Sequence, residues 1–233
     1  MIPIKGFIET SFLDWDGKLS SVIFLPGCNF RCPYCQNYPI ILAPEELPDI
    51  PFEGVEKFLN EHKGWIDGVV ISGGEPTIYA ELTELIQKIK RLGFLVKLDT
   101  NGSNPEMLKE LIGQKLIDYV AMDINAPLDK RYSPASGVEV VLDKIKESIQ
   151  ILMNSDIGYE FRTTVVPTFL GEEEIVEIAR SIAGAKKYVL QQFNPRQTLD
   201  PRLEIIEPYS KKEMEKMVNL AKDYVQTASL RGV

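Results

Sequence analysis

The feature that most restricts the fold of this chain is the alternation of short apolar strands with longer amphipathic segments. Predicted strands cover residues 21–25, 68–71, 94–98, 119–122, 159–165 and 188–191. Helical patterns cover residues 52–62, 78–92, 105–114, 138–154, 171–183 and 210–226. Strand followed by helix, repeated along the chain, predicts a parallel α/β sheet with right-handed crossovers. Six such units are too few to close an eight-stranded barrel, so we expect a three-quarter barrel with an open side.

The length of the chain suits a single domain of this kind, which we expect over residues 1–233. Asp16-Gly17 is a turn signal among alternating and aromatic residues and predicts an N-terminal hairpin within residues 1–20. The barrel core is expected at residues 21–195, followed by a C-terminal loop and helix at 196–233. Residues 38–51 contain four prolines and predict an irregular covering loop.

All three cysteines of the chain lie in the loop that follows the first barrel strand. Cys28, Cys32 and Cys35 have the spacing C-x3-C-x2-C, among residues that disfavour helices and strands. Three thiolates from one loop can hold a soft metal centre and leave one ligand position open. The single histidine, His62, lies among charged residues and is expected on a solvated helix surface rather than at the metal.

Polar residues follow three of the predicted strands, at the ends where β/α barrels carry their reactive groups. The second strand runs into Gly73-Gly74-Glu75-Pro76, where glycines allow close backbone approach and a carboxylate can receive an ammonium group. A plain strand-to-helix turn is the alternative. Asp99 and Asn101 follow the third strand, and Asp123 follows the fourth. A metal cation, ligand hydroxyls or helix N-capping could each satisfy the two carboxylates.

Two more polar positions point to the same end of the barrel. Arg162 interrupts an otherwise apolar strand, which is costly unless the guanidinium is paired. We expect it in the barrel mouth in contact with a ligand or carboxylate, with a structural ion pair as the alternative. Gln192 follows the last predicted strand, and its amide can hydrogen-bond ribose or adenine.

Cys28-x3-Cys32-x-Tyr34-Cys35, with an aromatic residue before the last cysteine, resembles the cluster loop of the radical S-adenosylmethionine (SAM) superfamily. The resemblance implies a partial (β/α)6 barrel of the TIM type. It also implies a [4Fe-4S] cluster on the three cysteines, SAM on the fourth iron, and contacts from residues 73–76 to the methionyl amino group. Tyr34 belongs to this cofactor-binding motif.

The residues after the third and fourth strands narrow the resemblance. Asp-Thr-Asn-Gly at 99–102 and Met-Asp-x-x-x-Pro at 122–127 resemble activating enzymes of glycyl radical enzymes. In that family the two aspartates lie near the SAM carboxylate and a monovalent cation. Many relatives carry Asp-x-Lys after the fourth strand, whereas this chain has Asp123-Ile124-Asn125, so the role of that lysine does not transfer.

The resemblance implies an activase that cleaves SAM reductively and uses the 5′-deoxyadenosyl radical to generate a glycyl radical on a partner enzyme. The expected partner is anaerobic ribonucleotide reductase. No cysteines remain for a second cluster, so a flavodoxin or ferredoxin is expected as electron donor. One alternative is a radical SAM enzyme that acts on a small molecule such as a deazapurine precursor. Another is a non-catalytic iron–sulfur or zinc module.

Net charge and hydropathy indicate which classes of partner to expect and where the protein is located. The net charge of −8 repels phosphate backbones and disfavours nucleic acid as a partner. No apolar run approaches the length of a membrane span, and the first residues lack the plan of a signal peptide. We therefore expect a cytoplasmic protein without a membrane partner.

Overall fold

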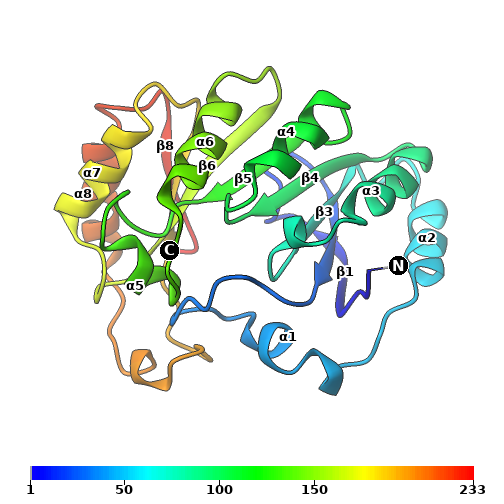
Figure 1. Cartoon of the computed structure of the whole chain (residues 1–233), viewed down its shortest axis with the longest axis horizontal. Helices are drawn as coiled ribbons and strands as arrows, with labels where there is room; N and C mark the ends of the chain where they lie inside the picture. The colour runs from blue at the N-terminus through cyan, green and yellow to red at the C-terminus, as the bar shows by residue number, and fades with distance from the viewer. Residues whose placement is uncertain (1) are drawn as a thin grey trace.

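The computed structural model describes residues 2–233 and contains a curved, open sheet of eight strands (Figure 1). The strands are β1 (Gly6–Ser11), β2 (Ser20–Leu25), β3 (Gly68–Gly73), β4 (Leu95–Thr100), β5 (Tyr119–Asp123), β6 (Gly158–Val165), β7 (Tyr188–Gln192) and β8 (Ala228–Arg231). They lie side by side in chain order. β1 is antiparallel to β2, and every later pair is parallel. The two edge strands, β1 and β8, do not pair, so the barrel stays open as predicted.

The longer helices follow the strands and lie in an arc outside the sheet (Figure 1). The helices are α1 (Tyr38–Leu42), α2 (Phe52–Glu61), α3 (Leu82–Arg91), α4 (Pro105–Gly113), α5 (Tyr132–Ser136), α6 (Leu142–Met153), α7 (Glu172–Ser181) and α8 (Lys211–Ala221). Short 3-10 turns cover Pro44–Glu46, Pro76–Ile78 and Pro201–Leu203. Within residues 2–233, no helix has the length and apolar character needed to cross a membrane.

The six predicted strand and helix units are all present, and the differences lie outside them. The prediction missed β8, which adds a parallel strand after α8. It was also wrong about residues 38–51, which contain α1 and a 3-10 turn. Pro39 and Pro44 stand near the starts of these two short helices, where a proline costs no hydrogen bond. The Asp16-Gly17 turn is confirmed, because Lys18 N donates to Trp15 O at 3.0 Å and Gly17 has φ +73°. The hairpin expected within residues 1–20 is wrong, because residues 12–19 form a loop and β1 pairs with the first barrel strand, β2.

The two faces of the sheet differ in chemistry because successive side chains of a strand alternate between faces. In β4, Val96 and Leu98 belong to the main apolar core, which lies between the sheet and the helices. The residues that alternate with them, Lys97 and Asp99, form ion pairs within the barrel. The barrel interior beside β4 is therefore polar, and the main apolar core lies outside the sheet.

The loop between β1 and β2 covers the barrel at the N-terminal end of the parallel strands. Trp15 is buried there in a separate apolar cluster with Val22 and Val70, and Tyr119 packs against that cluster. The same loop directs the backbone carbonyl of Asp14 to the ammonium group of Lys97. The loop between β1 and β2 thus closes the end of the barrel that lies opposite the cysteine loop.

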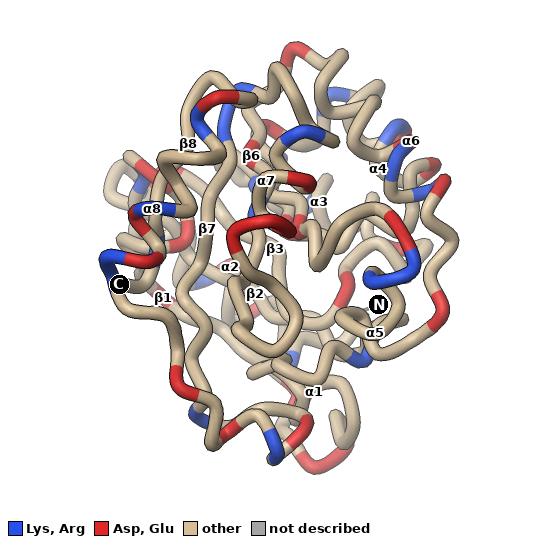
Figure 2. The backbone as a smooth tube through the Cα atoms, turned by 90° about the vertical axis from the view of Figure 1, so that its left-hand side faces the viewer, with Lys and Arg blue, Asp and Glu red and all other residues tan. Residues whose placement is uncertain are grey.

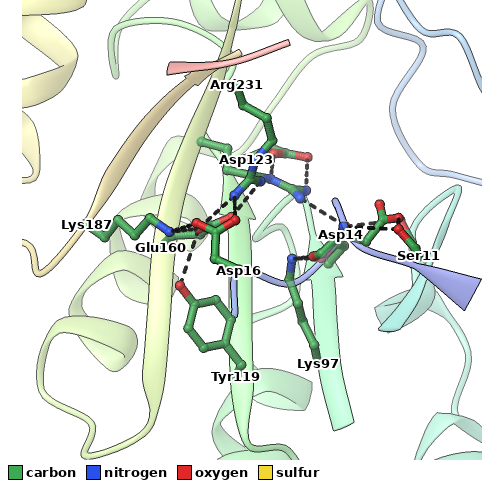
Figure 3. A network of polar contacts seen from close by, with 12 residues as sticks. Ser11, Asp14, Asp16, Lys97, Tyr119, Asp123, Glu160, Lys187 and Arg231 are labelled. Atoms are coloured by element: carbon green, nitrogen blue, oxygen red, sulfur yellow. Dashed lines mark hydrogen bonds and ion pairs between the residues drawn. The ribbon is translucent and has the colours of Figure 1, made fainter. Parts of the chain in front are cut away.

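An ion network around the buried Glu160 joins this N-terminal loop to the C-terminal strand (Figure 3). Glu160 of β6 accepts a hydrogen bond from Arg231 at 2.9 Å and pairs with Lys187 at 3.0 Å. Both cations also pair with Asp16 of the loop. The network therefore links the loop after β1 to β8, although the two edge strands themselves do not pair.

Candidate active site

A pocket of about 440 Å³ opens at the C-terminal ends of the parallel strands. Most of the residues predicted from the sequence line it: Cys28, Cys32, Tyr34, Cys35, Gly73, Gly74, Glu75, Asp99, Asn101, Asp123, Arg162 and Gln192. Pro76 is the exception among the predicted residues. It begins a 3-10 turn, is buried, and is absent from the pocket lining. The strand ends and the loop after β2 thus meet at one site, as the barrel rule predicts.

The three cysteines lie together in one wall of this pocket, and each is half-buried. Burial raises the pKa of the Cys28 thiol to about 12 and also raises the pKa values of Cys32 and Cys35. These thiols therefore need a nearby positive charge, such as a metal centre, to become thiolates. Within residues 2–233, no three His, Cys, Asp or Glu side chains are arranged to hold a single metal ion. Three sulfur donors from one loop suit an iron–sulfur cluster with one iron left open.

The cysteine loop is held against the end of β3 by backbone contacts. Gly74 N donates to Leu25 O at 2.8 Å, and Glu75 N donates to Gly27 O at 2.9 Å. A Cβ atom on Gly74 would lie only 1.7 Å from Gly27 O. The second glycine of the motif is thus required for the cysteine loop to approach β3 this closely.

The carboxylate of Glu75 joins the ends of β3 and β4. Glu75 is 1% exposed, and its Oε1 accepts hydrogen bonds from Thr77 N, Thr77 Oγ1 and Thr100 Oγ1 at 2.6–3.0 Å. Its Oε2 accepts from Asn101 N at 2.6 Å. Burial raises the pKa of Glu75, and these hydrogen bonds oppose the shift. Because four protein donors already bind this carboxylate, its contact with a ligand ammonium group stays a prediction.

Arg162 lies in the mouth, as expected, and bridges the two aspartates. Its Nε and one terminal nitrogen donate to the two oxygens of Asp123 at 2.8 and 3.2 Å. The other terminal nitrogen donates to Asp99 Oδ2 at 3.0 Å. Burial alone would raise the pKa of Asp99, but the charges of Arg162 and Lys97 lower it below its ordinary value. The guanidinium therefore supplies a positive charge beside both carboxylates.

Helix N-capping by these aspartates, the alternative interpretation, is wrong. Asn104 is the N-cap of the helix after β4, and its side chain accepts a hydrogen bond from Met107 N. Arg131 occupies the N-cap position of α5, the helix after β5. A monovalent cation near the aspartates remains a prediction, and Arg162 is the cation that the structure shows beside them.

Gln192 and His62 each contact a residue that the sequence did not indicate as a partner. Gln192 Nε2 donates to Tyr209 O at 3.0 Å, while its Oε1 is buried with no hydrogen-bond partner within the described residues. That free acceptor in the pocket wall suits a ligand hydroxyl or amino group. His62 lies at the C-terminal end of α2 and stacks on Phe58 at 4.0 Å between ring centroids, outside the pocket lining.

Asn125 and Ser136 had no predicted role in the site. Asn125 lines the pocket, and its Nδ2 lies 3.3 Å from Cys32 Sγ and 3.1 Å from Ser136 Oγ. The signal for Asn125 was present, because it stands where many relatives of the resembled family carry lysine. Nothing in the local sequence indicated Ser136, which lies at the C-terminal end of α5.

Residues 22–182 match the radical SAM superfamily, a span that includes the cysteine loop and the strand ends through β6. This chain belongs to the radical SAM superfamily. It is therefore an enzyme whose cofactors are a [4Fe-4S] cluster and SAM, and the non-catalytic module no longer fits. The cysteines and pocket polar groups described above fit both cofactors.

Relatives of this radical SAM enzyme match most of its length. A protein of Methanocaldococcus jannaschii, described provisionally as a glycyl-radical enzyme activating enzyme, is 34% identical over 99% of this chain and 96% of its own. The pyruvate formate-lyase-activating enzyme of Clostridium pasteurianum is 25% identical over 89% and 92%. The 7-carboxy-7-deazaguanine synthase of Thermococcus kodakarensis is 27% identical over 82% and 85%.

Solved structures share the fold of this radical SAM enzyme. The crystal structure of Streptococcus suis SuiB bound to S-adenosylmethionine matches with a TM-score of 0.69. The match covers 91% of this chain and 52% of SuiB at 16% identity. This likeness confirms the open barrel.

Proposed function

We propose that this radical SAM enzyme generates a glycyl radical on a partner enzyme, and that the partner is an anaerobic ribonucleotide reductase. The observation that carries the proposal is the 34% identity, over nearly the full length of both chains, to a protein described as an activating enzyme of this class. The activating enzyme of pyruvate formate-lyase also matches over most of both chains. The choice of reductase rests on the motifs at 99–102 and 122–127.

In this proposal the protein binds and orients SAM while the cofactors supply the radical chemistry. Cys28, Cys32 and Cys35 would hold the cluster, which when bound supplies one electron for the cleavage of SAM. Arg162 uses three of its five N–H donors on the two aspartates, so two remain for the carboxylate of SAM. The orphaned oxygen of Gln192 can accept a hydrogen bond from ribose or adenine.

The mouth of the pocket offers a wall against which a polypeptide could bind. Leu199 N donates to Cys35 O at 3.1 Å, and Asp200 N donates to Pro33 O at 2.8 Å. The segment after β7 therefore lies along the cysteine loop and extends the wall of the site. A glycine loop of the partner would enter between this wall and the exposed side of Asp123, whose side chain is 40% exposed.

The distribution of charge in the view of Figure 2 does not identify the electron donor. In Figure 2 acidic and basic residues are interspersed along the backbone. All three cysteines of the chain belong to the one cluster loop, so the proposal includes an external electron donor. A flavodoxin or ferredoxin fits this need.

The test is formation of a radical on the partner under anaerobic conditions. The enzyme is reconstituted with iron and sulfide, reduced, and mixed with SAM and a candidate reductase. The proposal predicts a doublet in the electron paramagnetic resonance spectrum, lost when the target glycine of the reductase is replaced by alanine. SAM cleavage without a doublet on any candidate reductase would contradict it.

The second candidate function is chemistry on a small heterocycle. The observation in its favour is the similarity to 7-carboxy-7-deazaguanine synthase over most of both chains. This function predicts that a small deazapurine precursor accelerates the formation of 5′-deoxyadenosine in the absence of any partner protein. The activase predicts no such acceleration, so the two assays together distinguish the functions.

A further inference from the structure

The loop between β5 and α5 places a side-chain amide against one cluster cysteine. Asn125 lies two residues beyond the end of β5 and is 7% exposed. Its Nδ2 donates to Cys32 Sγ at 3.3 Å and to Ser136 Oγ at 3.1 Å. Each hydrogen of the amide nitrogen thus has one acceptor, so the direction of the N–H···S contact is fixed.

The C-terminal end of α5 and its C-cap, Gly137, hold both ends of this contact. Ser136 is fully buried, and its backbone carbonyl accepts a hydrogen bond from Arg31 N at 2.9 Å. Gly137 has φ +68°, and a Cβ atom there would lie 1.9 Å from Arg31 O. Arg31 directly precedes Cys32, so one short segment positions the amide donor and the backbone beside its sulfur acceptor.

We propose that Asn125, positioned by Ser136, raises the reduction potential of the cluster through its hydrogen bond to the Cys32 sulfur. The step concerned is the one-electron reduction of the cluster by a low-potential donor, with no bond broken and no proton transferred. Reduction adds negative charge to the cluster and its sulfur ligands, so a fixed N–H donor stabilises the reduced state more than the oxidised state. Loss of the donor lowers the potential.

Asn125 is the side chain that allows a clean test. Cys28 Sγ accepts from Phe30 N at 3.3 Å, but that donor is backbone and no substitution of Phe30 removes it. Asn101 Nδ2 lies 3.9 Å from Cys28 Sγ and instead donates to Asn29 at 2.9 Å. Of these two amide contacts to sulfur, the one at Cys32 is therefore the shorter, and it is open to substitution. The Tyr34 side chain also hydrogen-bonds to Cys32, and it is left unchanged in every variant.

The experiment is an equilibrium redox titration of the reconstituted holoenzyme, followed by the electron paramagnetic resonance signal of the reduced cluster. Asn125→Leu keeps a similar volume and removes the donor. At a fixed solution potential the ratio of reduced to oxidised cluster should fall about two- to tenfold, the range set by one hydrogen bond. Asn125→Lys keeps a donor and adds a positive charge, so the ratio should rise.

Two substitutions in α5 complete the set. Ser136→Ala leaves residue 125 unchanged but frees its amide, and the ratio should fall by less than in Asn125→Leu. Ser133→Ala is the matched control, because Ser133 Oγ contacts Val140 N and not Asn125 or a cysteine. Its midpoint potential should equal that of the unaltered enzyme. Iron and sulfide content, with circular dichroism, shows which variants load a complete cluster and fold.

An unchanged potential in Asn125→Leu with a full cluster would overturn the proposal. If that variant loads no cluster, the Lys and Ser136→Ala variants carry the test, and an unchanged potential in either overturns it. Failure of all three to load, with an intact fold, would also overturn it, since the amide would then hold the cluster rather than tune it. The inference rests on the cluster alone, so its failure is distinguishable from failure of the activase proposal, which is measured on the partner.

Discussion

The buried carboxylate of Glu75 has a structural role in addition to its predicted contact with a ligand. Its four donors come from the turn after β3 and from the end of β4, so it ties together two segments that face the pocket. If a buried acceptor that binds several donors is replaced by a group that must itself donate, some of these polar atoms lose their partners.

The substitution Glu75→Gln tests this role. The amide nitrogen of glutamine would face either Asn101 N or the threonine donors, so at least one hydrogen bond becomes a donor–donor contact. We expect the free energy of unfolding of the cluster-free protein to fall by about 1–3 kcal/mol, measured by urea titration. Glu147→Gln on the exposed surface of α6 is the control and should change stability little. Equal stabilities of the two variants would contradict the structural role of Glu75.

At the scale of elements, the backbone of the cysteine loop is in direct contact with the backbone at the end of β3. Gly74→Ala would bring a Cβ atom to 1.7 Å from Gly27 O, and both groups are backbone or fixed to it. We expect a loss of roughly 2–4 kcal/mol in stability and reduced iron content after reconstitution.

The control for this prediction is Gly54→Ala in α2, where a Cβ atom would meet nothing within 4 Å. Alanine favours a helix over glycine by up to about 1 kcal/mol, so this variant should gain stability and keep its iron. Full iron loading in Gly74→Ala would show that the loop does not need its contact with β3.

The link between the N-terminal loop and β8 depends on the charge of Glu160. Burial alone would raise its pKa, but the hydrogen bond from Arg231 and the nearby charges of Lys97 and Arg231 lower the pKa to about 2 from an ordinary value of 4.5. A depressed carboxyl pKa contributes stability that is complete above the unfolded value and lost as pH falls through the folded value. Glu160 should therefore contribute roughly 3 kcal/mol that disappears between about pH 4.5 and pH 2.

This pH dependence is measured as the free energy of urea unfolding of the cluster-free protein at several pH values. Glu160→Gln should be less stable at pH 7 and should lose less stability than the unaltered protein as the pH falls to 2. Asp156→Asn, which changes an exposed acid, should retain the full dependence. The same slope in Glu160→Gln and the unaltered protein would disprove the contribution of Glu160.

At the scale of the whole molecule, the barrel could be predicted because its sequence patterns are strong and local. Six strands and six helices had clear periodicity, and the rule for strand ends brought Asp99, Asp123 and Arg162 to one mouth. β8 was missed because it is four residues long and only half-buried, so it lacks a continuous apolar run. The mutual pairing of Arg162 with both aspartates could not be read from the sequence, since it depends on how three strands lie beside one another.

Long-range contacts account for the rest of what the sequence did not show. Asn125 and Cys32 are 93 residues apart, and no local signal says that they touch. The same holds for Asp16 and Arg231, which come from opposite ends of the chain and meet across the open side of the barrel. Spacing predicted the cysteine ligands, whereas the contacts of those cysteines emerged only from the fold.

The most direct measurement of the central claim is reductive cleavage of SAM by the reconstituted, reduced enzyme. 5′-Deoxyadenosine and methionine should form in equal amounts, and their formation should be lost in Cys28→Ala, Cys32→Ala and Cys35→Ala. A protein that holds a complete cluster, binds SAM and yields no 5′-deoxyadenosine would contradict the assignment of this pocket.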